Sequence, residues 1–262
     1  MRSRLDTELV RRGLARSREQ AQELIESGQI KVSGIKVLKV ASQVDENSAI
    51  ELTANISEYV SRGAHKLIGA LNEFKGLPVE GRICLDAGAS TGGFTEVLLE
   101  RGARQVMAVD VGYGQIAWKL RQDERVKVFD RTNIRGIDQD LLGTKVDLIV
   151  ADLSFISLKT VLPALQQVAN AECDYLLMVK PQFEVGRERL GAGGVVRDPS
   201  LRKEAILEVA ERAYQLGLGI RGVVASPLPG PSGNVEYFLW LHNGGEPITP
   251  ELVDEAIERG PK

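Results

Sequence analysis

The first forty residues carry two helical patterns of apolar side chains and then an alternating one. Apolar residues recur every three or four positions over residues 4–14 and again over 17–27, which predicts two amphipathic helices. Gly13 and Gly28 stand where these helices should end, because glycine readily adopts the left-handed conformation found at helix C-termini. The segment QIKVSGIKV, at 29–37, alternates apolar and polar residues around a Ser-Gly turn. We therefore expect a small α+β unit here.

The pattern changes from residue 82 onward, where apolar runs alternate with segments of helical periodicity. Candidate strands lie at 82–86, 105–110, 126–130, 146–152, 175–180, 222–226 and 235–241. Candidate helices lie between them at about 92–101, 115–122, 158–169 and 200–216. This alternation predicts an α/β fold, with a doubly wound, mostly parallel sheet of seven strands and helices on both faces. The last two strands are joined by SPLPGPSGN without a helix, which suits an antiparallel hairpin.

A polar stretch separates these two regions. The residues NISEYVS, at 55–61, show no clear periodicity, and a new helical pattern starts directly after them. We expect a linker at about 55–61, an N-terminal domain over residues 1–60 and a larger domain over 62–262.

Charge is distributed unevenly between the two regions. The chain of 262 residues has a net charge of −3, yet residues 1–40 contain nine Lys or Arg against five acids. The N-terminal region is therefore about +4 and the remainder about −7. This asymmetry favours a local polyanion-binding module, with a solvated basic face as the alternative.

Cysteine, histidine and hydrophobic content narrow the class of protein. Cys84 and Cys173 lie far apart in apolar runs and are interpreted as reduced core residues of a cytosolic protein. With only two histidines, a zinc site is improbable and no metal is expected. No apolar run is long enough to span a bilayer. We expect a cytoplasmic protein with no stable membrane association.

The segment LDAGASTGGF, at 85–94, places a glycine-rich turn directly after the first strand of the sheet. Such turns let a ligand approach the backbone at the carboxyl end of a strand. A dinucleotide site would favour G-x-G-x-x-G, but position 90 is serine and Gly92-Gly93 comes one step late. S-adenosylmethionine, which has a sulfonium cation and no phosphate, fits better. The alternative is that the glycines only form the turn.

Acidic residues at three successive strand ends support this cofactor. Asp86 can face the cationic groups, Asp110 can accept from the ribose hydroxyls, and Asp130 can reach the adenine. A single acid in such a position is often only a helix cap, whereas three together are more specific. The predicted cofactor-binding residues are Asp86, Gly88, Ser90, Thr91, Gly92, Gly93, Phe94, Asp110, Val111, Asp130 and Asp152.

Two lysines and two acids are expected near the same edge of the sheet. Asp152 follows the fourth strand, Lys180 the fifth, Glu236 starts the seventh, and Lys66 lies on the helix before the first. This arrangement resembles the Lys-Asp-Lys-Glu tetrad of the FtsJ-type ribose 2′-O-methyltransferases, whose glycine-rich turn DAGASTGGF also matches. The resemblance implies a class I, Rossmann-like methyltransferase domain. Lys180 would activate the hydroxyl, Asp152 would orient that lysine, and Lys66 and Glu236 would be positioning partners. The alternative is a set of surface ion pairs.

The N-terminal region resembles the S4 RNA-binding domain. The likeness rests on the strings RLD, GL, SR and LI, and on IKVSG in the alternating segment. In that family the arginine-lined face of the helix pair grips the RNA backbone, so phosphate contacts would supply affinity and orientation. The alternative is a helical cap that stabilises the larger domain. The candidate RNA-binding residues are Arg4, Arg11, Arg12, Arg16, Arg18 and Lys36.

The whole chain resembles the bacterial TlyA family, which is also labelled haemolysin A. The strings that carry the likeness are SRGAHKL, CLDAGASTGGFTEVLL, VDVGYGQ, VDLIVADLSFISL, VKPQFEVG and SPLPGPSGNVEYFLW. The resemblance implies 2′-O-methylation of cytidine in ribosomal RNA, 23S and in some members 16S, with ribosomal subunits as partners. A membrane-lysing protein, an RNA-binding module with an inert methyltransferase domain, and a methyltransferase for another structured RNA such as tRNA are the alternatives.

Overall fold

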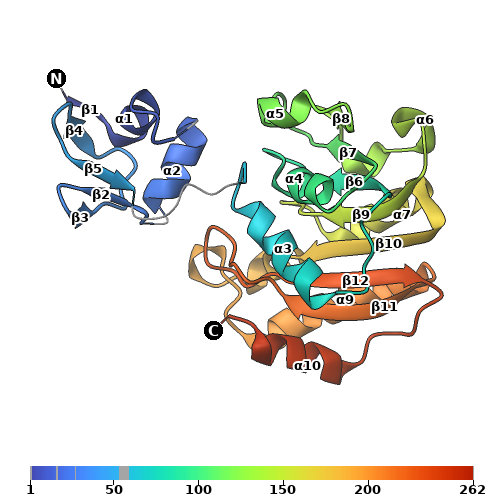
Figure 1. Cartoon of the computed structure of the whole chain (residues 1–262). Coiled ribbons are helices and arrows are strands. Elements are labelled where there is room, and N and C mark those ends of the chain that lie inside the picture. Colours follow the sequence, from blue (N-terminus) through green and yellow to red (C-terminus); the bar gives the residue numbers. More distant parts are fainter. Residues whose placement is uncertain (1, 16, 27, 53–58, 262) are drawn as a thin grey trace. The chain divides into compact units, whose positions relative to one another are not determined.

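The chain divides into two compact units, Met1–Ser61 and Arg62–Lys262 (Figure 1). The computed structural model describes residues 2–15, 17–26, 28–52 and 59–261. Most of the expected linker and the predicted RNA contact Arg16 lie outside these described residues.

The first unit is a small α+β arrangement with its own apolar core. Its elements are β1 Arg2–Arg4, α1 Leu5–Arg11, α2 Arg18–Glu26, β2 Ile30–Val32, β3 Ile35–Lys36, β4 Gln43–Asp45 and β5 Ile50–Leu52. Strand β2 pairs antiparallel with β3 and β5, and β1 pairs antiparallel with β4. The helices bury Leu5, Leu9 and Ile25 against each other and the strands. Strands β1, β4 and β5 lie outside the alternating segment at 29–37, so the sequence did not predict them.

Two buried carboxylates hold the first unit together. Asp6 accepts hydrogen bonds at 3.0 Å from both Arg4 and Arg18, which links α1 to α2. Glu8 accepts from Arg11 at 2.8 Å and from Arg12 at 2.7 Å. The Arg4 guanidinium, followed by that of Arg18, holds the pKa of Asp6 well below its usual range. Four of the predicted RNA contacts therefore also stabilise the fold of this unit.

The second unit is built on one seven-stranded sheet. Its strands are β6 Ile83–Ala87, β7 Gln105–Val109, β8 Val126–Phe129, β9 Val146–Ala151, β10 Ala169–Val179, β11 Leu218–Ala225 and β12 Tyr237–Asn243. The order across the sheet is β11-β12-β10-β9-β6-β7-β8. Strands β6 to β10 are parallel, while β12 runs antiparallel to both of its neighbours, β10 and β11. The predicted fold class and terminal hairpin are confirmed.

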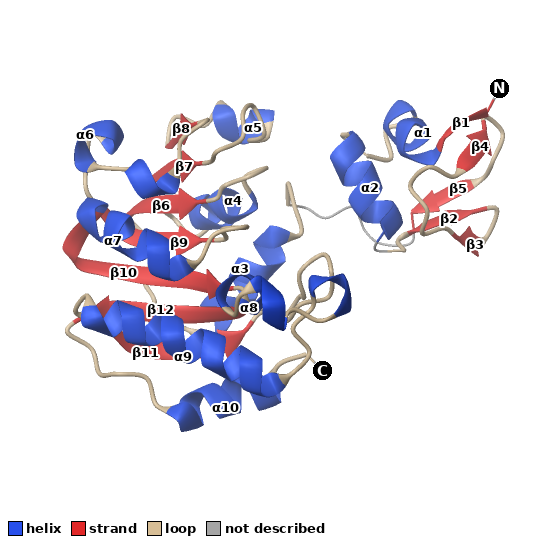
Figure 2. Cartoon of the chain, turned by 180° about the vertical axis from the view of Figure 1, so that it is seen from behind, coloured by secondary structure: helices blue, strands red, loops and turns tan. Residues whose placement is uncertain are grey.

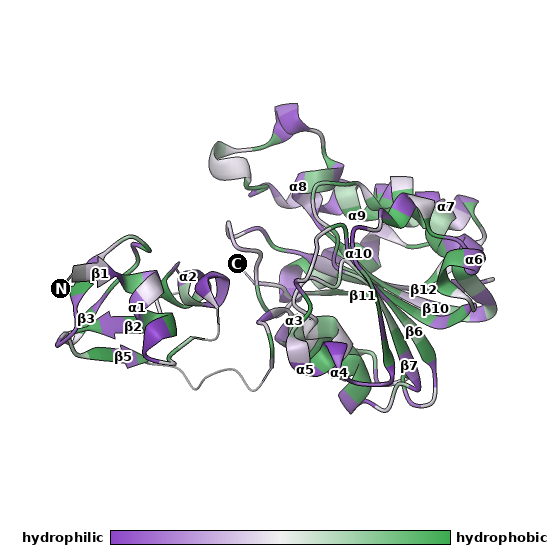
Figure 3. Ribbon diagram, turned by 90° about the horizontal axis from the view of Figure 1, so that it is seen from above, coloured by the Kyte–Doolittle hydropathy of each residue, from purple (hydrophilic) through white to green (hydrophobic). Residues whose placement is uncertain are grey.

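Helices cover both faces of this sheet. They are α3 Gly63–Glu73, α4 Gly93–Glu100, α5 Trp118–Arg121, α6 Gln139–Leu142, α7 Leu158–Val168, α8 Pro181–Glu184, α9 Pro199–Gln215 and α10 Pro250–Arg259, with 3-10 turns at Ile134–Gly136, Arg187–Arg189 and Ala192–Gly194. Helices α3 and α4 lie on one face (Figure 1), and α7 and α9 lie on the other (Figure 2). The strands between them are mostly hydrophobic (Figure 3), and Cys84 in β6 and Cys173 in β10 are buried free thiols.

Several elements differ from the sequence-based expectation in length or existence. Strand β10 begins at Ala169, six residues before the expected start. The sequence did not predict this part of the strand, because its residues are polar and partly exposed and because the pairing with β9 shifts register between Ala169 and Asp174. Helices α6, α8 and α10 were not predicted. Helix α10 starts with Pro250 after the N-cap Thr249, but only Val253 and Ala256 are buried, which is a weak apolar signal.

Asp6 should make the stability of the first unit depend on pH. Because its pKa in the folded state is lowered, its contribution is complete above the ordinary carboxyl pKa of about 4 and is lost as the pH falls further. Asp6→Asn should destabilise this unit by about 1–3 kcal/mol at pH 7. Thermal unfolding followed through the methyl signals of Leu5 in the full chain measures this. The matched control is Glu51→Gln, which changes an exposed acid in β5 and should have no such effect.

Candidate active site

The sheet brings the predicted site residues to one edge. Because β6 to β10 are parallel, their carboxyl ends all lie on the same side of the sheet. Asp86 is the penultimate residue of β6, and Asp110, Asp130 and Asp152 directly follow β7, β8 and β9. The backbone N–H of Asp152 donates to the carbonyl of Ala87 at 3.0 Å, which fixes the end of β9 against the end of β6.

The glycine-rich turn is needed for close packing at this edge. Gly88 and Gly92 have φ of +86° and +96°, in the left-handed region that favours glycine. A Cβ on Gly88 would lie 2.6 Å from the carbonyl oxygen of Asp152, and a Cβ on Gly92 would overlap Leu120. Ser90 also has a positive φ, of 48°. The turn is therefore held tightly against the neighbouring strand end, and Ser90 within it is exposed.

Asp110 connects the glycine-rich turn to the loop after β7. One carboxylate oxygen accepts from the backbone N–H of Ser90 at 2.8 Å, and the other accepts from that of Gly112 at 2.7 Å. The neighbouring Val111 is 70% exposed. A carboxylate offers about four acceptor sites, so two remain for hydroxyl groups of a ligand.

Three other predicted cofactor residues differ in their surroundings. The carbonyl of Thr91 accepts from the N–H of Ala117 at 3.1 Å. Asp130 forms an ion pair with Arg121 at 2.7 Å, so one of its oxygens is already engaged. Phe94 is buried and stacks on Phe238, with ring centroids 6.1 Å apart. Its contacts are those of a core residue at the start of α4.

Asp86 is buried with only part of its hydrogen-bonding capacity used. Its Oδ2 accepts from the hydroxyl of Thr95 at 2.7 Å, while Oδ1 has no hydrogen-bond partner among the described residues. Burial, together with the nearby charges of Asp152 and Asp110, raises the pKa of Asp86 to about 7. An unsatisfied, buried acid of this kind favours a cationic group beside it, because that group would restore the ionised form.

The two lysines and two acids form two ion pairs. The Nζ of Lys66 lies 2.5 Å from Oε2 of Glu236, and both side chains are buried. The Nζ of Lys180 lies 2.6 Å from Oδ1 of Asp152 and donates a hydrogen bond to the hydroxyl of Ser154 at 3.0 Å. The geometry of the Lys180–Asp152 contact is that of a charge pair and not of an aligned hydrogen bond, since that oxygen has no hydrogen-bond partner among the described residues.

The antiparallel strand β12 brings the two pairs to neighbouring positions. Val179 in β10 is paired with Tyr237 in β12. Lys180, which follows Val179, and Glu236, which precedes Tyr237, therefore lie next to each other at the end of this ladder. Lys66 reaches Glu236 from the buried face of α3. A Cβ on Gly230 would lie 2.7 Å from Oε1 of Glu236, so the SPLPGPSGN loop passes directly over this carboxylate.

Sequence reasoning missed three side chains that support the site. Thr95 binds Asp86, and Ser154 binds Lys180. Asn234 is buried, accepts from the N–H of Val196 at 2.9 Å and donates to the carbonyl of Gly194 at 3.0 Å, which joins two loops at this edge. Threonine, serine and asparagine are common near strand ends, so their presence alone does not indicate a role in a site. Only Ser154 could have been predicted, because it lies two positions after Asp152 in the sequence.

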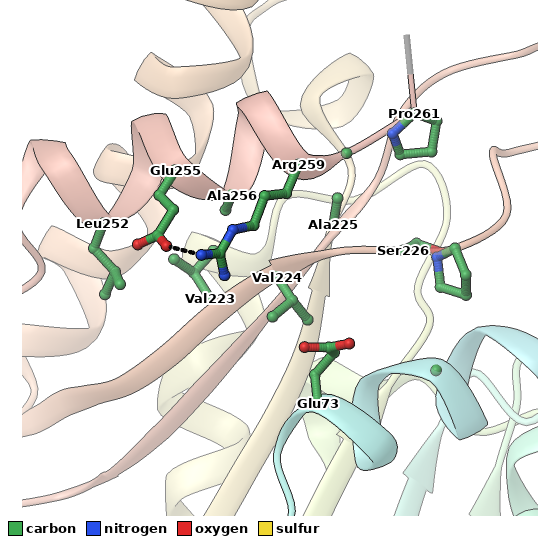
Figure 4. Close-up of a pocket in the computed structure, with 13 residues that line it drawn as sticks. Glu73, Val223, Val224, Ala225, Ser226, Leu252, Glu255, Ala256, Arg259 and Pro261 are labelled. Carbon is green, nitrogen blue, oxygen red and sulfur yellow. Dashed lines mark ion pairs between the residues drawn. The ribbon is translucent and has the colours of Figure 1, made fainter.

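A separate pocket of about 520 Å³ lies between α3, β11 and α10 (Figure 4). Its wall includes Val224 of β11 and Glu73 of α3, together with Glu255 and Arg259, which form an ion pair along α10. It contains none of the predicted catalytic or cofactor-binding residues. Within the described part of the chain, no helix is long and apolar enough to cross a membrane.

Both units match known protein families. Residues 59–243 match the model of the FtsJ-like methyltransferases, and residues 3–50 match that of the S4 domain. The 16S/23S rRNA (cytidine-2′-O)-methyltransferase TlyA of Mycobacterium tuberculosis is 56% identical over 98% of this chain and 97% of its own. Hemolysin A of Brachyspira hyodysenteriae is 38% identical over 90% of this chain and 98% of its own. A solved structure from Streptococcus thermophilus, described only as a candidate hemolysin, has 36% identity and a TM-score of 0.79, covering 98% of this chain and 95% of its own.

The buried pair Lys66–Glu236 should respond differently to single and double substitution. Lys66→Met leaves the Glu236 carboxylate buried without its partner, so the free energy of unfolding should fall by about 3–5 kcal/mol. The double variant Lys66→Met, Glu236→Met replaces both charges with apolar groups of similar size and should regain most of that loss. Urea unfolding measures both.

A matched surface pair gives the control for this comparison. Lys203 and Asp254 lie 2.6 Å apart but are 30% and 50% exposed, so Lys203→Met should cost less than about 1 kcal/mol. An equally small loss for Lys66→Met would show that Glu236 is not held by this lysine in a desolvated site.

Proposed function

Because the chain belongs to the TlyA family of FtsJ-like methyltransferases, we propose that it methylates the 2′-hydroxyl of a cytidine in ribosomal RNA. The single observation that carries this proposal is the pair of lysine–carboxylate contacts beside the glycine-rich turn. A ribose hydroxyl is a poor nucleophile near neutral pH, and a lysine held at the reaction site addresses that need. The M. tuberculosis relative is named for both 16S and 23S rRNA, which supports ribosomal subunits as substrates.

The residues at the ends of β6, β7 and β8 fit S-adenosylmethionine, which would supply an electrophilic methyl group on a sulfonium cation. The unsatisfied Oδ1 of Asp86 would face the cationic part of the ligand. The free acceptor sites of Asp110 would bind the ribose hydroxyls, and Asp130 and Val111 would contact the adenine. Backbone at Gly88, Ser90, Thr91, Gly92 and Gly93 would line the methionine portion.

In this mechanism Lys180 acts directly on the substrate hydroxyl. The Lys180 ammonium would first lose its own proton to solvent, and the neutral amine would then accept a hydrogen bond from the hydroxyl. With S-adenosylmethionine bound, this amine would take up the hydroxyl proton while the oxygen–methyl bond forms and the sulfur–methyl bond breaks. Asp152 and Ser154 hold the amine in place. Lys66 and Glu236 sit beside it as a positioning pair. Much of the rate comes from holding the oxygen in line with the methyl group, because the sulfonium already activates the carbon.

The first unit would bind RNA phosphates next to its structural ion pairs. Arg4, Arg11 and Arg18 contact buried acids, yet their side chains remain 43%, 60% and 58% exposed. Their outer surfaces can therefore also contact phosphate. Arg12 is only 22% exposed and also donates to three backbone carbonyls, so its main contribution is structural. Lys36 is exposed at the end of the β2–β3 hairpin.

The proposed reaction predicts a specific loss in Lys180→Ala. Wild-type protein incubated with labelled S-adenosylmethionine and separated ribosomal subunits should label a cytidine ribose, which mapping of the modified sugar identifies. Lys180→Ala should label none, because the hydroxyl loses its activating amine, while the cofactor Kd measured by calorimetry stays nearly constant. Lys159→Ala, at a surface lysine of α7, is the control and should keep activity. A large loss of cofactor binding in Lys180→Ala would contradict the assigned role.

The proposed RNA contact of Lys36 predicts a change in salt dependence. Lys36→Glu should weaken binding to ribosomal subunits and reduce the slope of log K against log[salt] by about 1, because one phosphate contact is lost. Lys145→Glu makes the same charge change at an exposed position of the second unit and should leave the slope almost constant. Equal effects of the two variants would indicate a response to net charge alone.

A further inference from the structure

Two segments that leave the sheet side by side carry the catalytic pair. The segment after β9 runs from Asp152 to Ser157, where α7 begins, and the segment after β10 runs from Lys180 through α8 to Glu184. Near the sheet they are joined by the Lys180 contacts with Asp152 and Ser154. The position of the amine relative to these partners therefore depends on how the two segments are held together.

Glu184 joins the same two segments at their far ends. One of its carboxylate oxygens accepts from the hydroxyl of Ser157 at 2.5 Å, and the other accepts from the backbone N–H of Leu158 at 2.8 Å. The side chain is buried, with only 8% exposed. Burial raises its pKa, whereas the hydrogen bonds from Ser157 and Leu158 favour the ionised form.

Capping of α7 alone does not explain this carboxylate. The hydroxyl of Ser157 already accepts from the N–H of Lys159 at 3.2 Å and so provides the N-cap. Glu184 adds the connection between α7 and α8, which a local cap does not need. Between the two connections, the rings of Phe155 and Phe183 lie 5.2 Å apart, so the segments are in contact along their length.

We infer that Glu184 is a positioning residue, which fixes the segment bearing Asp152 and Ser154 to the segment bearing Lys180. The inference rests on the proposed function, because it assigns to Glu184 the alignment of the amine that acts on the ribose hydroxyl. Displacement of a catalytic group by about 1 Å reduces a rate by as much as about a hundredfold. A connection only four residues from Lys180 controls displacements on that scale.

The test compares two substitutions of similar volume. Glu184→Met fills the same space without an acceptor, and its kcat should fall about 10- to 100-fold while the KM for RNA and the cofactor Kd change little. Glu184→Gln keeps an acceptor for Leu158 and a polar partner for Ser157, so it should regain most of the activity. The control is Asp138→Ala, which removes the N-cap of α6 before β9, at the opposite edge, and should keep wild-type kcat.

A second readout separates this inference from the proposed reaction. Amide hydrogen exchange in residues 152–157 should be faster in Glu184→Met than in the wild type, and this measurement needs no RNA. A folded Glu184→Met protein with wild-type kcat and exchange overturns the inference, whereas a wild type that labels no RNA overturns the proposed function. If Glu184→Met does not fold, Ser157→Ala removes one of the two bonds together with the N-cap of α7 and should lower kcat severalfold. An unchanged kcat in Ser157→Ala would then reject the positioning role.

Discussion

The site depends on the cost of burying charged amines at the edge of a sheet. An ammonium group removed from water is destabilised unless an opposite charge contacts it directly. Lys66 meets this requirement through Glu236, and the almost buried Lys180 meets it through Asp152. Asp152 directly follows β9, and Glu236 directly precedes β12. Both strands must therefore take their places in the sheet before the two lysines can be buried beside their partners. The same contacts that stabilise the edge therefore arrange its chemistry.

The first unit uses the same principle with the charges exchanged. There the acids Asp6 and Glu8 are buried, and the cations that neutralise them remain partly exposed. A guanidinium has five donors in a planar fork, so it can hold an internal carboxylate and still present donors to a phosphate. RNA binding and folding are thus expected to share side chains in this unit, while the second unit keeps its buried pairs for the reaction.

The sequence predicted the fold where a regular hydrophobic pattern extended over many residues, and it predicted site residues where they lie at the ends of strands. The alternation of strands and helices predicted the sheet, and hence that Asp86, Asp110 and Asp152 would share one edge. It did not predict the Glu184–Ser157 contact, because residues 27 positions apart on two short segments leave no periodic signal. Nor did it predict that Phe94 packs into the core, since an aromatic residue after a glycine-rich turn is compatible with either role.

The reversed direction of β12 has a consequence for the newly made protein. Glu236 directly precedes this strand, and its partner Lys66 lies 170 positions earlier in the sequence. Strand β12 lies between β10 and β11 in the sheet but follows both in the sequence. The sheet is therefore incomplete until β12 has been synthesised. A growing chain still attached to the ribosome that makes it has Lys66 and the glycine-rich turn long before it has Glu236. The buried pair accordingly forms only after the whole span from α3 to β12 has been synthesised.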